Sequence, residues 1–511
     1  MILGEPFEVF APAYEAGRPQ IVWTRLINDL ETPVSAYLKI AYGRPYAFLF
    51  ESVEGGAWRG RYSIVAMKPD LVWRCLGDQA EIAEGDAIAE GRFKAQPGPA
   101  LDSLRDVVAG ARLDMPEGLP PMAAGLFGVI GYDMARLCEP LPNVNPDPLC
   151  LPDAILMRPS IVAIFDAIAQ EIILATTVRA KGGISARQAH GAARDRLEAV
   201  IADLRRFLPS SAPPEGGASG DLASPISREA YGDLVERAKA YIRAGDIFQV
   251  VPSHRFSAPF TLDPFALYRS LRRTNPSPFL YYLDLASAQL VGSSPEILVR
   301  LRDGKITIRP IAGTRPRGAT PAEDAALEAE LLADAKERAE HLMLLDLGRN
   351  DVGRVAQLKE RGRNAPAATR RAPRVRVTES FVVERYSHVM HIVSNVEGDA
   401  PENLDPVDVL MAALPAGTLS GAPKVRAMQI IDELETVKRG LTYAGAVGYF
   451  GADGSVDTCI VLRTGLVKDG TLHVQAGGGV VADSDPDSEY EETLQKARAL
   501  RRAAEEAWRF G

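Results

Sequence analysis

The spacing of apolar and polar positions predicts a chain that mixes strands with helices. Residues Ser160–Val178 are rich in β-branched side chains and are broken by a turn-like segment, which indicates a hairpin. Residues 185–207 are rich in Ala, Leu and Arg, and Ser185 can cap their start, so we expect a helix there. Helical spacing predicts a second helix from Ser227 to Gly245, followed by a short strand at 248–251.

Two capping boxes predict further helices in the second half of the chain. One begins at Thr320, with proline at the first helical position, and predicts a single long helix to about Leu347. The other begins near Ser488 and predicts a last helix. Strand composition is found between them at 382–396 and 445–463.

One stretch of the chain has the composition of a linker. Leu208–Ser224 reads LPSSAPPEGGASGDLAS, which is rich in Pro, Gly and Ser and has no apolar period. We therefore predict a strand-rich N-terminal domain at 1–207, a linker at 208–226 and a C-terminal domain at 227–511.

The composition excludes several classes of protein. The 511 residues are 46% hydrophobic and 24% charged, which is typical of a globular enzyme, and the net charge of −9 disfavours non-specific binding of nucleic acid. We find no apolar run long enough to span a membrane and no secretion signal, so we expect a cytoplasmic protein. The four cysteines are too few for a disulfide scaffold, and none lies in a glycine-flanked nucleophile motif.

A basic stretch at Lys359–Arg376 has two interpretations. It holds many Lys and Arg residues and a single acid, Glu360, which would suit nucleic acid or an acidic partner. The stretch has no interleaved aromatic residues for base stacking, and the whole chain is acidic. We therefore favour a solvated surface loop, centred on 359–374, and expect no nucleic-acid partner.

Two pairs of carboxylates are candidates for a metal site. Glu337 and Glu340 lie three residues apart on the predicted long helix, and Glu489 and Glu492 do so on the last helix. Clustered carboxylates repel each other, and a hard divalent cation such as Mg²⁺ would offset this. The alternative is that these acids complement helix dipoles, which suits Glu489 but not Glu337 or Glu340, well past the first turn.

Two histidines and three glycine-rich turns are candidates for binding or catalysis. His388 and His391 lie on a predicted strand and should face opposite sides, so they cannot easily share a metal. One could act as an acid or base, although a packed histidine is the simpler interpretation. The turns at 310–318, 416–424 and 475–479 could offer backbone N–H groups to a carboxylate, although each could be an ordinary turn.

Taken together, these segments resemble the chorismate-utilising enzymes, in particular the anthranilate synthase component I family. The resemblance covers nearly the whole chain and is densest from Gly245 to Arg498. The matching motifs are GDIFQVVPS at 245–253, GSSPE at 292–296, PIAGTRPRG at 310–318, ERAEH at 337–341, LGRNDVGRV at 347–355, RYSHVMHIVSNV at 385–396, PAGTLSGAPKVRAMQIID at 415–432, DTCIVLRT at 457–464 and QAGGGVVADSDPDSEYEET at 475–493.

The resemblance implies a fold and a set of site residues. The fold would be α+β, with two orthogonally packed antiparallel β-sheets flanked by helices and the active site in a central cleft. Mg²⁺ would be held by Glu340 and Glu492, supported by Glu337 and Glu489. Glu296 would protonate the departing hydroxyl, His391 would serve the pyruvate-releasing step and Thr418 would line the pocket. The implied substrate-binding residues are Gln249, Gly313, Thr314, Tyr449, Arg463, Gly477, Gly478 and Gly479.

The resemblance also implies which member of the family this chain is similar to. Para-aminating relatives carry a lysine nucleophile where this chain has Ala312, and an alanine cannot form that adduct. Isochorismate and salicylate synthases carry a water-activating lysine where this chain has Gln249. Both differences favour ammonia as the nucleophile and anthranilate and pyruvate as products. The alternatives are a 4-amino-4-deoxychorismate synthase component I and a non-catalytic tryptophan-sensing homologue.

Regulation and a partner are implied in the same way. Because the chain has no suitable cysteine, ammonia would come from a separate glutamine amidotransferase subunit, in a heterotetramer of two of each. Tryptophan would act as a feedback inhibitor, bound by the N-terminal domain and a nearby loop. The implied inhibitor-binding residues are Glu51, Ser52, Arg61, Tyr62, Ser63, Asn275, Pro276, Ser277, Pro278, Phe279, Leu280 and Cys459.

Overall fold

The computed structural model describes residues 3–52, 60–141, 144–180, 182–208, 220–356, 375–386, 389–401 and 404–510. The predictions for the basic stretch at 359–374, for His388 and for the centre of the linker lie outside the described residues.

The described strands form two antiparallel sheets that share two long strands, β3 (Tyr62–Leu76) and β7 (Ala154–Asp166). The register between them shifts between Pro69 and Leu71, where the pair passes from one sheet into the other. The first sheet has the order β1 (Gln20–Ile27), β8 (Glu171–Val178), β7, β3, β2 (Phe48–Glu51), β11 (Phe279–Asp284), β12 (Gln289–Ser294), β21 (Thr464–Lys468), β22 (Thr471–Gly477) and β10 (Ser253–Pro259).

The second sheet carries several of the candidate site residues. Its order is β5 (Lys94–Ala95), β4 (Gln79–Glu84), β3, β7, β6 (Gly125–Ile130), β19 (Ala446–Gly451), β20 (Val456–Ile460), β13 (Ile297–Arg302), β14 (Lys305–Ile308) and β17 (Val389–Asp399). Strands β15 (Ile311–Pro316) and β16 (Val375–Arg385) both pair with β17. A separate short ladder joins β9 (Gln249–Val250) to β18 (Gly421–Ala422).

The apolar core lies in three layers. A central cluster fills the space between the two sheets, with side chains such as Phe48, Phe127 and Leu290. The outer face of the first sheet is covered by α1 (Phe7–Glu15), α2 (Pro33–Ile40), α5 (Ala186–Leu204), α7 (Pro264–Thr274) and α12 (Pro486–Glu506). The outer face of the second is covered by α4 (Ala100–Ala111), α6 (Arg228–Arg243), α9 (Ala335–Ala356), α10 (Pro406–Ala413) and α11 (Lys424–Leu434).

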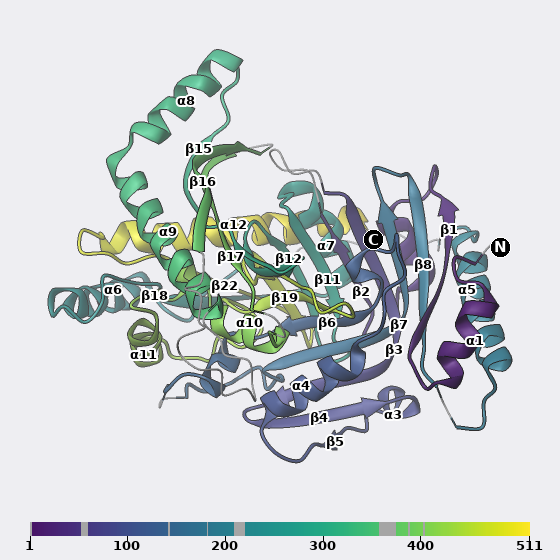
Figure 1. The fold of residues 1–511 in the computed structure, drawn as a ribbon. Helices are drawn as coiled ribbons and strands as arrows, with labels where there is room; N and C mark the ends of the chain where they lie inside the picture. The colour runs from purple at the N-terminus through teal and green to yellow at the C-terminus, as the bar shows by residue number, and fades with distance from the viewer. Residues whose placement is uncertain are drawn as a thin grey trace.

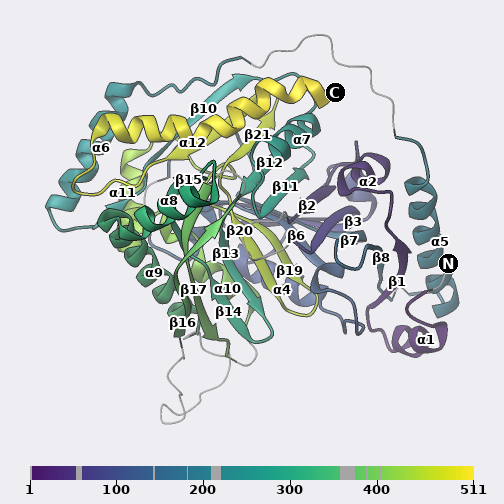
Figure 2. The same cartoon turned by 90° about the horizontal axis from the view of Figure 1, so that it is seen from above.

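The figures show how these helices are distributed. In Figure 1, α1 and α5 lie at the side of β1 and β8, and α9 and α10 lie toward the opposite side of the molecule. In Figure 2 the yellow α12 runs along the first sheet beside α7. The α+β class and the antiparallel sheets flanked by helices are therefore confirmed.

Each sheet joins a block of strands from before the predicted linker to a block of strands from after it. In the first sheet β2 pairs with β11, and in the second β6 pairs with β19. The boundary at 208–226 stays a prediction, but the two parts of the chain share both sheets. None of the described helices is long and apolar enough to cross a membrane.

Several predicted elements are confirmed and others are corrected. The hairpin forms as β7 and β8, and Ser185 and Ser227 cap α5 and α6 as predicted. The prediction of a single long helix from Thr320 is wrong, because the segment forms two helices, α8 (Pro321–Ala333) and α9. Asp334 causes the break, since its Oδ1 accepts hydrogen bonds from the N–H groups of Lys336 and Glu337 and begins a new helix.

The start of the last helix and the two long strand segments are also corrected. Asp485, and not Ser488, caps α12, because its Oδ1 accepts the N–H of Ser488. The segment 382–396 belongs to two strands, β16 and β17, and 445–463 likewise forms β19 and β20. Composition identified the strand residues but not the turns, because each segment folds back as a hairpin, β16 on β17 and β19 on β20.

Candidate active site

Glu296 is a buried carboxyl at the turn between β12 and β13. Its main-chain carbonyl accepts the N–H of Ile460, which ties this turn to β20. Thr418 lies in the short turn Gly417–Leu419 after α10 and donates a hydrogen bond to Glu296 Oε1 at 3.5 Å. Burial raises the pKa of Glu296 to about 8, although the Thr418 contact lowers it. Glu296 is therefore protonated at neutral pH and can donate a proton.

His391 lies on β17 and faces the neighbouring strand β15. Its Nδ1 is 3.0 Å from the carbonyl oxygen of Gly313 and 3.1 Å from Oγ1 of Thr314. Because a carbonyl can only accept, Nδ1 carries the hydrogen and Nε2 is the basic nitrogen. Burial lowers the pKa of His391, and the nearby positive charge of Arg463 lowers it further. His391 is therefore a neutral imidazole able to accept a proton at Nε2.

Arg463 is a cation suited to an anionic ligand. Its backbone is in the left-handed region, with φ of 46°, which is unusual for a residue with a side chain. Burial lowers the pKa of its guanidinium. Within the described parts of the chain no carboxylate pairs with it, whereas most arginines of this protein are paired. A guanidinium in this state can pair with the carboxylate of a ligand.

The four candidate metal-binding glutamates converge from α9 and α12. Burial raises the pKa of Glu340, and the charges of Glu337 and Glu492 raise it further. Burial also raises the pKa of Glu489, and Glu492 contributes to the increase, although Ser484 lowers it. These effects require that the acids lie near one another, so the structure brings both pairs together across the two helices.

Three of the four glutamates are bound by a neighbouring side chain. Glu492 pairs with Lys496 at 2.7 Å, Glu337 accepts from Arg315 at 3.2 Å, and Glu489 accepts from Ser484 at 2.7 Å. In the described ranges, no three His, Cys, Asp or Glu side chains are arranged to coordinate an ion. The other oxygen of Glu489 is buried without a hydrogen-bond partner. The all-oxygen donor set and this unsatisfied atom fit a hard divalent cation.

Glycines 477–479 pass close to other candidate residues of the substrate site. A side chain at Gly478 or Gly479 would collide with them. A Cβ on Gly478 would lie 2.6 Å from Oε2 of Glu489, and one on Gly479 would lie 2.5 Å from Nε2 of Gln249. The carbonyl of Gly477 accepts a hydrogen bond from Lys496 at 2.9 Å. This backbone therefore lies between Gln249 and the acids of α12. Similarly, a Cβ on Gly313 would lie 3.2 Å from Oε2 of Glu337.

Tyr449 lies apart from these residues, and its role in substrate binding stays a prediction. Its hydroxyl accepts a hydrogen bond from Arg302 at 3.2 Å, and its ring lines a separate, larger cavity. The reason is the period-two alternation of β19, in which Val447 and Tyr449 share the face toward the other sheet.

Sequence reasoning missed two residues that do lie in the site. Tyr443 is buried, and its hydroxyl is close enough to Lys496 and Glu492 for their charges to affect its pKa, which burial raises. Lys496 pairs with Glu492 and lies one helical turn after it on α12. The i, i+4 spacing of Glu492 and Lys496 is a signal that could have identified the lysine.

The cavity that Tyr449 lines, called the larger cavity, has a volume of about 730 Å³ and lies between the sheets. It contains most of the predicted inhibitor-binding residues. Glu51 accepts hydrogen bonds from Arg272 at 2.7 and 3.0 Å. The predicted residues that line the cavity are Glu51, Ser52, Arg61, Tyr62, Pro278, Phe279, Leu280 and Cys459. Four others, Ser63, Asn275, Pro276 and Ser277, do not line it. Among these, Asn275 instead exchanges hydrogen bonds with Ser293.

Comparisons with known proteins give a consistent result. A family model described as chorismate binding enzyme matches residues 68–502. The anthranilate synthase component 1 of Cereibacter sphaeroides is 56% identical over 505 residues, covering 99% of this chain and 98% of that protein. The protein of the same name from Thermus thermophilus is 46% identical over 481 residues, covering 94% of this chain and 97% of that protein.

Solved structures include two similar folds. Anthranilate synthase component I from Streptococcus pneumoniae has a TM-score of 0.72 and 34% identity, covering 94% of this chain and 99% of that chain. The menaquinone-specific isochorismate synthase of Escherichia coli has a TM-score of 0.66 and 19% identity, covering 96% of this chain and 95% of that chain. The second likeness concerns the fold alone.

Proposed function

The chain belongs to the chorismate-binding enzyme family, and from this premise we propose that it converts chorismate and ammonia into anthranilate and pyruvate. The observation that carries the proposal is the buried, protonated Glu296 next to Thr418. Relatives named anthranilate synthase component 1 that match almost the full length of the chain support it.

The site residues have roles that follow from their protonation and contacts. Ammonia adds at C2 of the ring while Glu296 protonates the 4-hydroxyl, which leaves as water. A positioned acid of this kind contributes roughly 10²–10⁴-fold to the rate. His391 then accepts the C2 proton at Nε2 as the C3–O bond breaks and the ring becomes aromatic. The enolpyruvate that leaves takes up a proton at its methylene carbon and becomes pyruvate. Arg463, which has no carboxylate partner among the described residues, would pair with the enolpyruvyl carboxylate.

We propose that Glu340 and Glu492 hold Mg²⁺, with Glu337 and Glu489 in support. When bound, the ion would offset the repulsion among these acids and bind the ring carboxylate of the substrate. The backbone of Gly478 and Gly479, which passes close to Glu489 and Gln249, would lie beside the enolpyruvyl carboxylate. We propose that Tyr443, whose hydroxyl lies near Glu492 and Lys496, also contacts the substrate.

Two positions support ammonia as the nucleophile. Ala312 on β15 offers no amine to attack the ring, and Gln249 beside Gly479 offers no base to activate water. Lys496 is a lysine of the site, and it is ion-paired with Glu492. Burial would lower its pKa, but the neighbouring carboxylates raise it, so it stays protonated and is neither a nucleophile nor a base.

We further propose a partner and a regulator. Ammonia would be supplied by a glutamine amidotransferase subunit, in a heterotetramer of two of each chain in the cytoplasm. Tryptophan would bind in the cavity lined by Glu51, Ser52 and Phe279, where a buried acid and aromatic rings suit an ammonium group and an indole. Its inhibition would require a different affinity for active and inactive states.

A product assay tests this proposal. The purified chain is supplied with chorismate, Mg²⁺ and an ammonium salt at alkaline pH, and the products are separated by chromatography and detected by fluorescence. Anthranilate and pyruvate in equal amounts are the expected result. Para-aminobenzoate or its precursor would instead indicate 4-amino-4-deoxychorismate synthase, and tryptophan binding without turnover would indicate a non-catalytic sensor.

A further inference from the structure

A buried arginine behind the active site contacts several segments that build it. We propose that Arg439 is a positioning residue for the proposed reaction. Through two main-chain carbonyls, it fixes the Thr418 turn and the Gln249 segment relative to each other. The inference rests on the proposed function for its kinetic part, and on the contacts of Arg439 for its structural part.

The guanidinium of Arg439 joins two segments that are distant in sequence. Its Nη1 donates to the carbonyl of Leu419 at 2.8 Å, directly after Thr418. Its Nη2 donates to the carbonyl of Val251 at 2.6 Å, two residues after Gln249. The side chain is 1% exposed, so no water competes for these bonds. The main-chain N–H of Val251 also donates to the carbonyl of Ser420, so the two segments form one unit.

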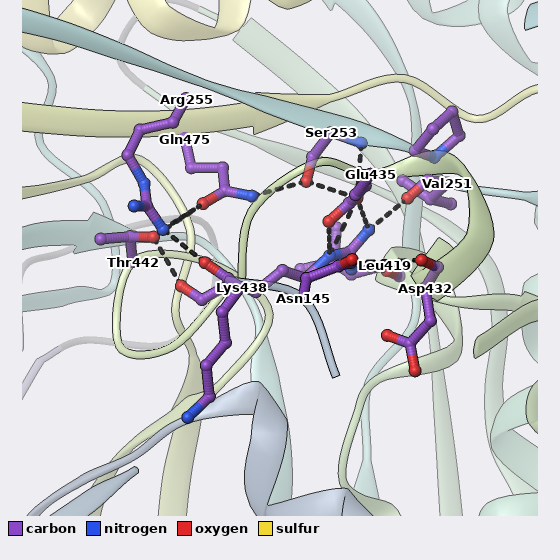
Figure 3. A network of polar contacts seen from close by, with 12 residues as sticks. Asn145, Val251, Ser253, Arg255, Leu419, Asp432, Glu435, Lys438, Thr442 and Gln475 are labelled. Carbon is purple, nitrogen blue, oxygen red and sulfur yellow. Dashed lines mark hydrogen bonds and ion pairs between the residues drawn. The ribbon is translucent and has the colours of Figure 1, made fainter. Parts of the chain in front are cut away.

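Glu435 holds the guanidinium in this orientation. Its carboxylate accepts hydrogen bonds from Nε of Arg439 at 3.0 and 3.1 Å, and its side chain is 3% exposed. The same carboxylate accepts the N–H and the hydroxyl of Ser253, both at 2.8 Å. Figure 3 shows Glu435 next to Ser253 and Val251.

The network continues to the strand that leads to the glycine turn. Gln475 on β22 donates to Ser253 at 2.9 Å and accepts from Thr442 at 2.8 Å, as Figure 3 shows. Thr442 also donates to the carbonyl of Arg439 at 2.7 Å, which closes a ring of contacts. Gln475 lies two residues before Gly477, so the network reaches the substrate-binding glycines.

Arg439 also contacts the tyrosine of the site. Its guanidinium lies over the ring of Tyr443 at 5.2 Å and over that of Tyr132 at 4.6 Å. One cation therefore contacts the turn of Thr418, the segment of Gln249 and the ring of Tyr443. Only a planar fork of donors can serve both carbonyls and the carboxylate at once, and a lysine ammonium cannot reproduce that geometry.

The proposal predicts a specific kinetic effect. If the Thr418 turn shifts, Thr418 and Glu296 lose their alignment, and a misplacement of about 1 Å can cost about 100-fold in rate. Arg439 contacts the Thr418 turn directly but reaches the glycine turn only through Thr442 and Gln475, so KM should change much less than kcat. A general loss of stability would instead lower the amount of folded enzyme and leave the properties of the folded fraction unchanged.

Arg439→Lys is compared with the matched control Arg136→Lys. Arg136 is also enclosed and pairs with two acids, Asp133 and Asp432, both of which lie outside segments 248–252 and 414–422. Each variant is assayed with chorismate, Mg²⁺ and ammonium, with the folded fraction measured for each. Hydrogen exchange is followed by mass spectrometry in segments 248–252 and 414–422, and this measurement does not depend on turnover.

For Arg439→Lys we expect kcat to fall at least about tenfold with KM within about threefold of wild type, and faster exchange in both segments. Arg136→Lys should show neither effect. Equal kcat values and equal exchange for the two variants would overturn the proposal. If Arg439→Lys does not fold, Glu435→Asp, which withdraws the carboxylate, should show the same two effects, and normal values there would overturn it.

The wild-type protein separates this proposal from the proposed function. If wild type makes no anthranilate, the proposed function is wrong, and the exchange comparison still decides whether Arg439 holds the two segments. If wild type is active and Arg439→Lys is equally active, the positioning role alone is wrong.

Discussion

The hydroxyl of Thr418 lies 3.5 Å from Oε1 of Glu296 and donates to a carboxyl whose other main influence is burial. Burial favours the protonated acid, while this hydrogen bond favours the carboxylate. Their balance gives Glu296 a pKa of about 8, which suits a proton donor at neutral pH.

Thr418→Val should move the pH dependence of the reaction. Glu296 works as an acid only when protonated, so the rate of wild type should fall as pH rises past about 8. Removing the hydroxyl removes the contact that lowers the pKa, so this fall should shift to higher pH in the variant. Rates are measured across a pH series at constant free ammonia. A fall at the same or lower pH in the variant would count against this role of Thr418.

Glu296→Gln should abolish most activity but stabilise the protein at alkaline pH. Between pH 4.5 and about 8 the unfolded carboxyl is ionised while the folded one stays protonated. The unfolded state then binds fewer protons, so wild-type stability falls as pH rises through this window. The neutral amide has no such dependence.

The free energies of unfolding of Glu296→Gln and wild type are compared by denaturant titration at several pH values. The advantage of the variant should grow by at most about 1.4 kcal/mol per pH unit up to about pH 8. Activity should fall roughly 10²–10⁴-fold. A difference in stability that does not vary with pH would show that Glu296 is not held protonated.

Glu492→Gln should weaken the response to Mg²⁺. The variant removes one of the converging carboxylates, whereas Glu491→Gln changes the adjacent residue, which pairs with Arg228 away from the site. Isothermal titration with Mg²⁺, together with activity after removal of the ion by a chelator, compares the two. We expect binding and activity to be lost for Glu492→Gln and kept for Glu491→Gln. Equal behaviour of the two variants would exclude Glu492 as a ligand.

Ser52→Phe should relieve inhibition by tryptophan while leaving catalysis intact. Ser52 lines the larger cavity, and a benzyl side chain there would occupy space needed by the ligand. Ser63→Ala is the control, because Ser63 does not line that cavity. Inhibition curves for both variants check this, and unchanged inhibition in Ser52→Phe would place the inhibitor elsewhere.

Local signals in the sequence predicted much of the fold. Capping residues such as Ser185, Ser227 and Thr320 start helices through contacts within four residues, and the structure confirms these starts. The break at Asp334 was missed because this aspartate lies among other acidic residues of a helical segment. Nothing in the local pattern marks it as the start of a new helix. The pairing of β2 with β11 depends on residues more than two hundred positions apart, which no local pattern encodes.

The sequence likewise predicted some residues of the candidate site and missed others. The order of the motifs predicted that Glu296, Thr418, His391 and Gly313 belong to one site. In the structure Thr418 contacts Glu296, and Gly313 contacts His391. Tyr443 and Tyr449 lie six residues apart, and no local pattern shows that Tyr449 lies on β19 and lines the separate cavity while Tyr443 precedes that strand. Arg439 was not identified, because its contacts with Leu419 and Val251 form only after the chain has folded.

The most direct test of the account is the position of the new nitrogen in the product. The purified chain is incubated with chorismate, Mg²⁺ and ¹⁵N-ammonium, and the product is examined by NMR. The account predicts the labelled nitrogen on the carbon next to the one that bears the carboxylate, with pyruvate released in equal amount. A label para to the carboxylate, or a hydroxylated product without nitrogen, would contradict it.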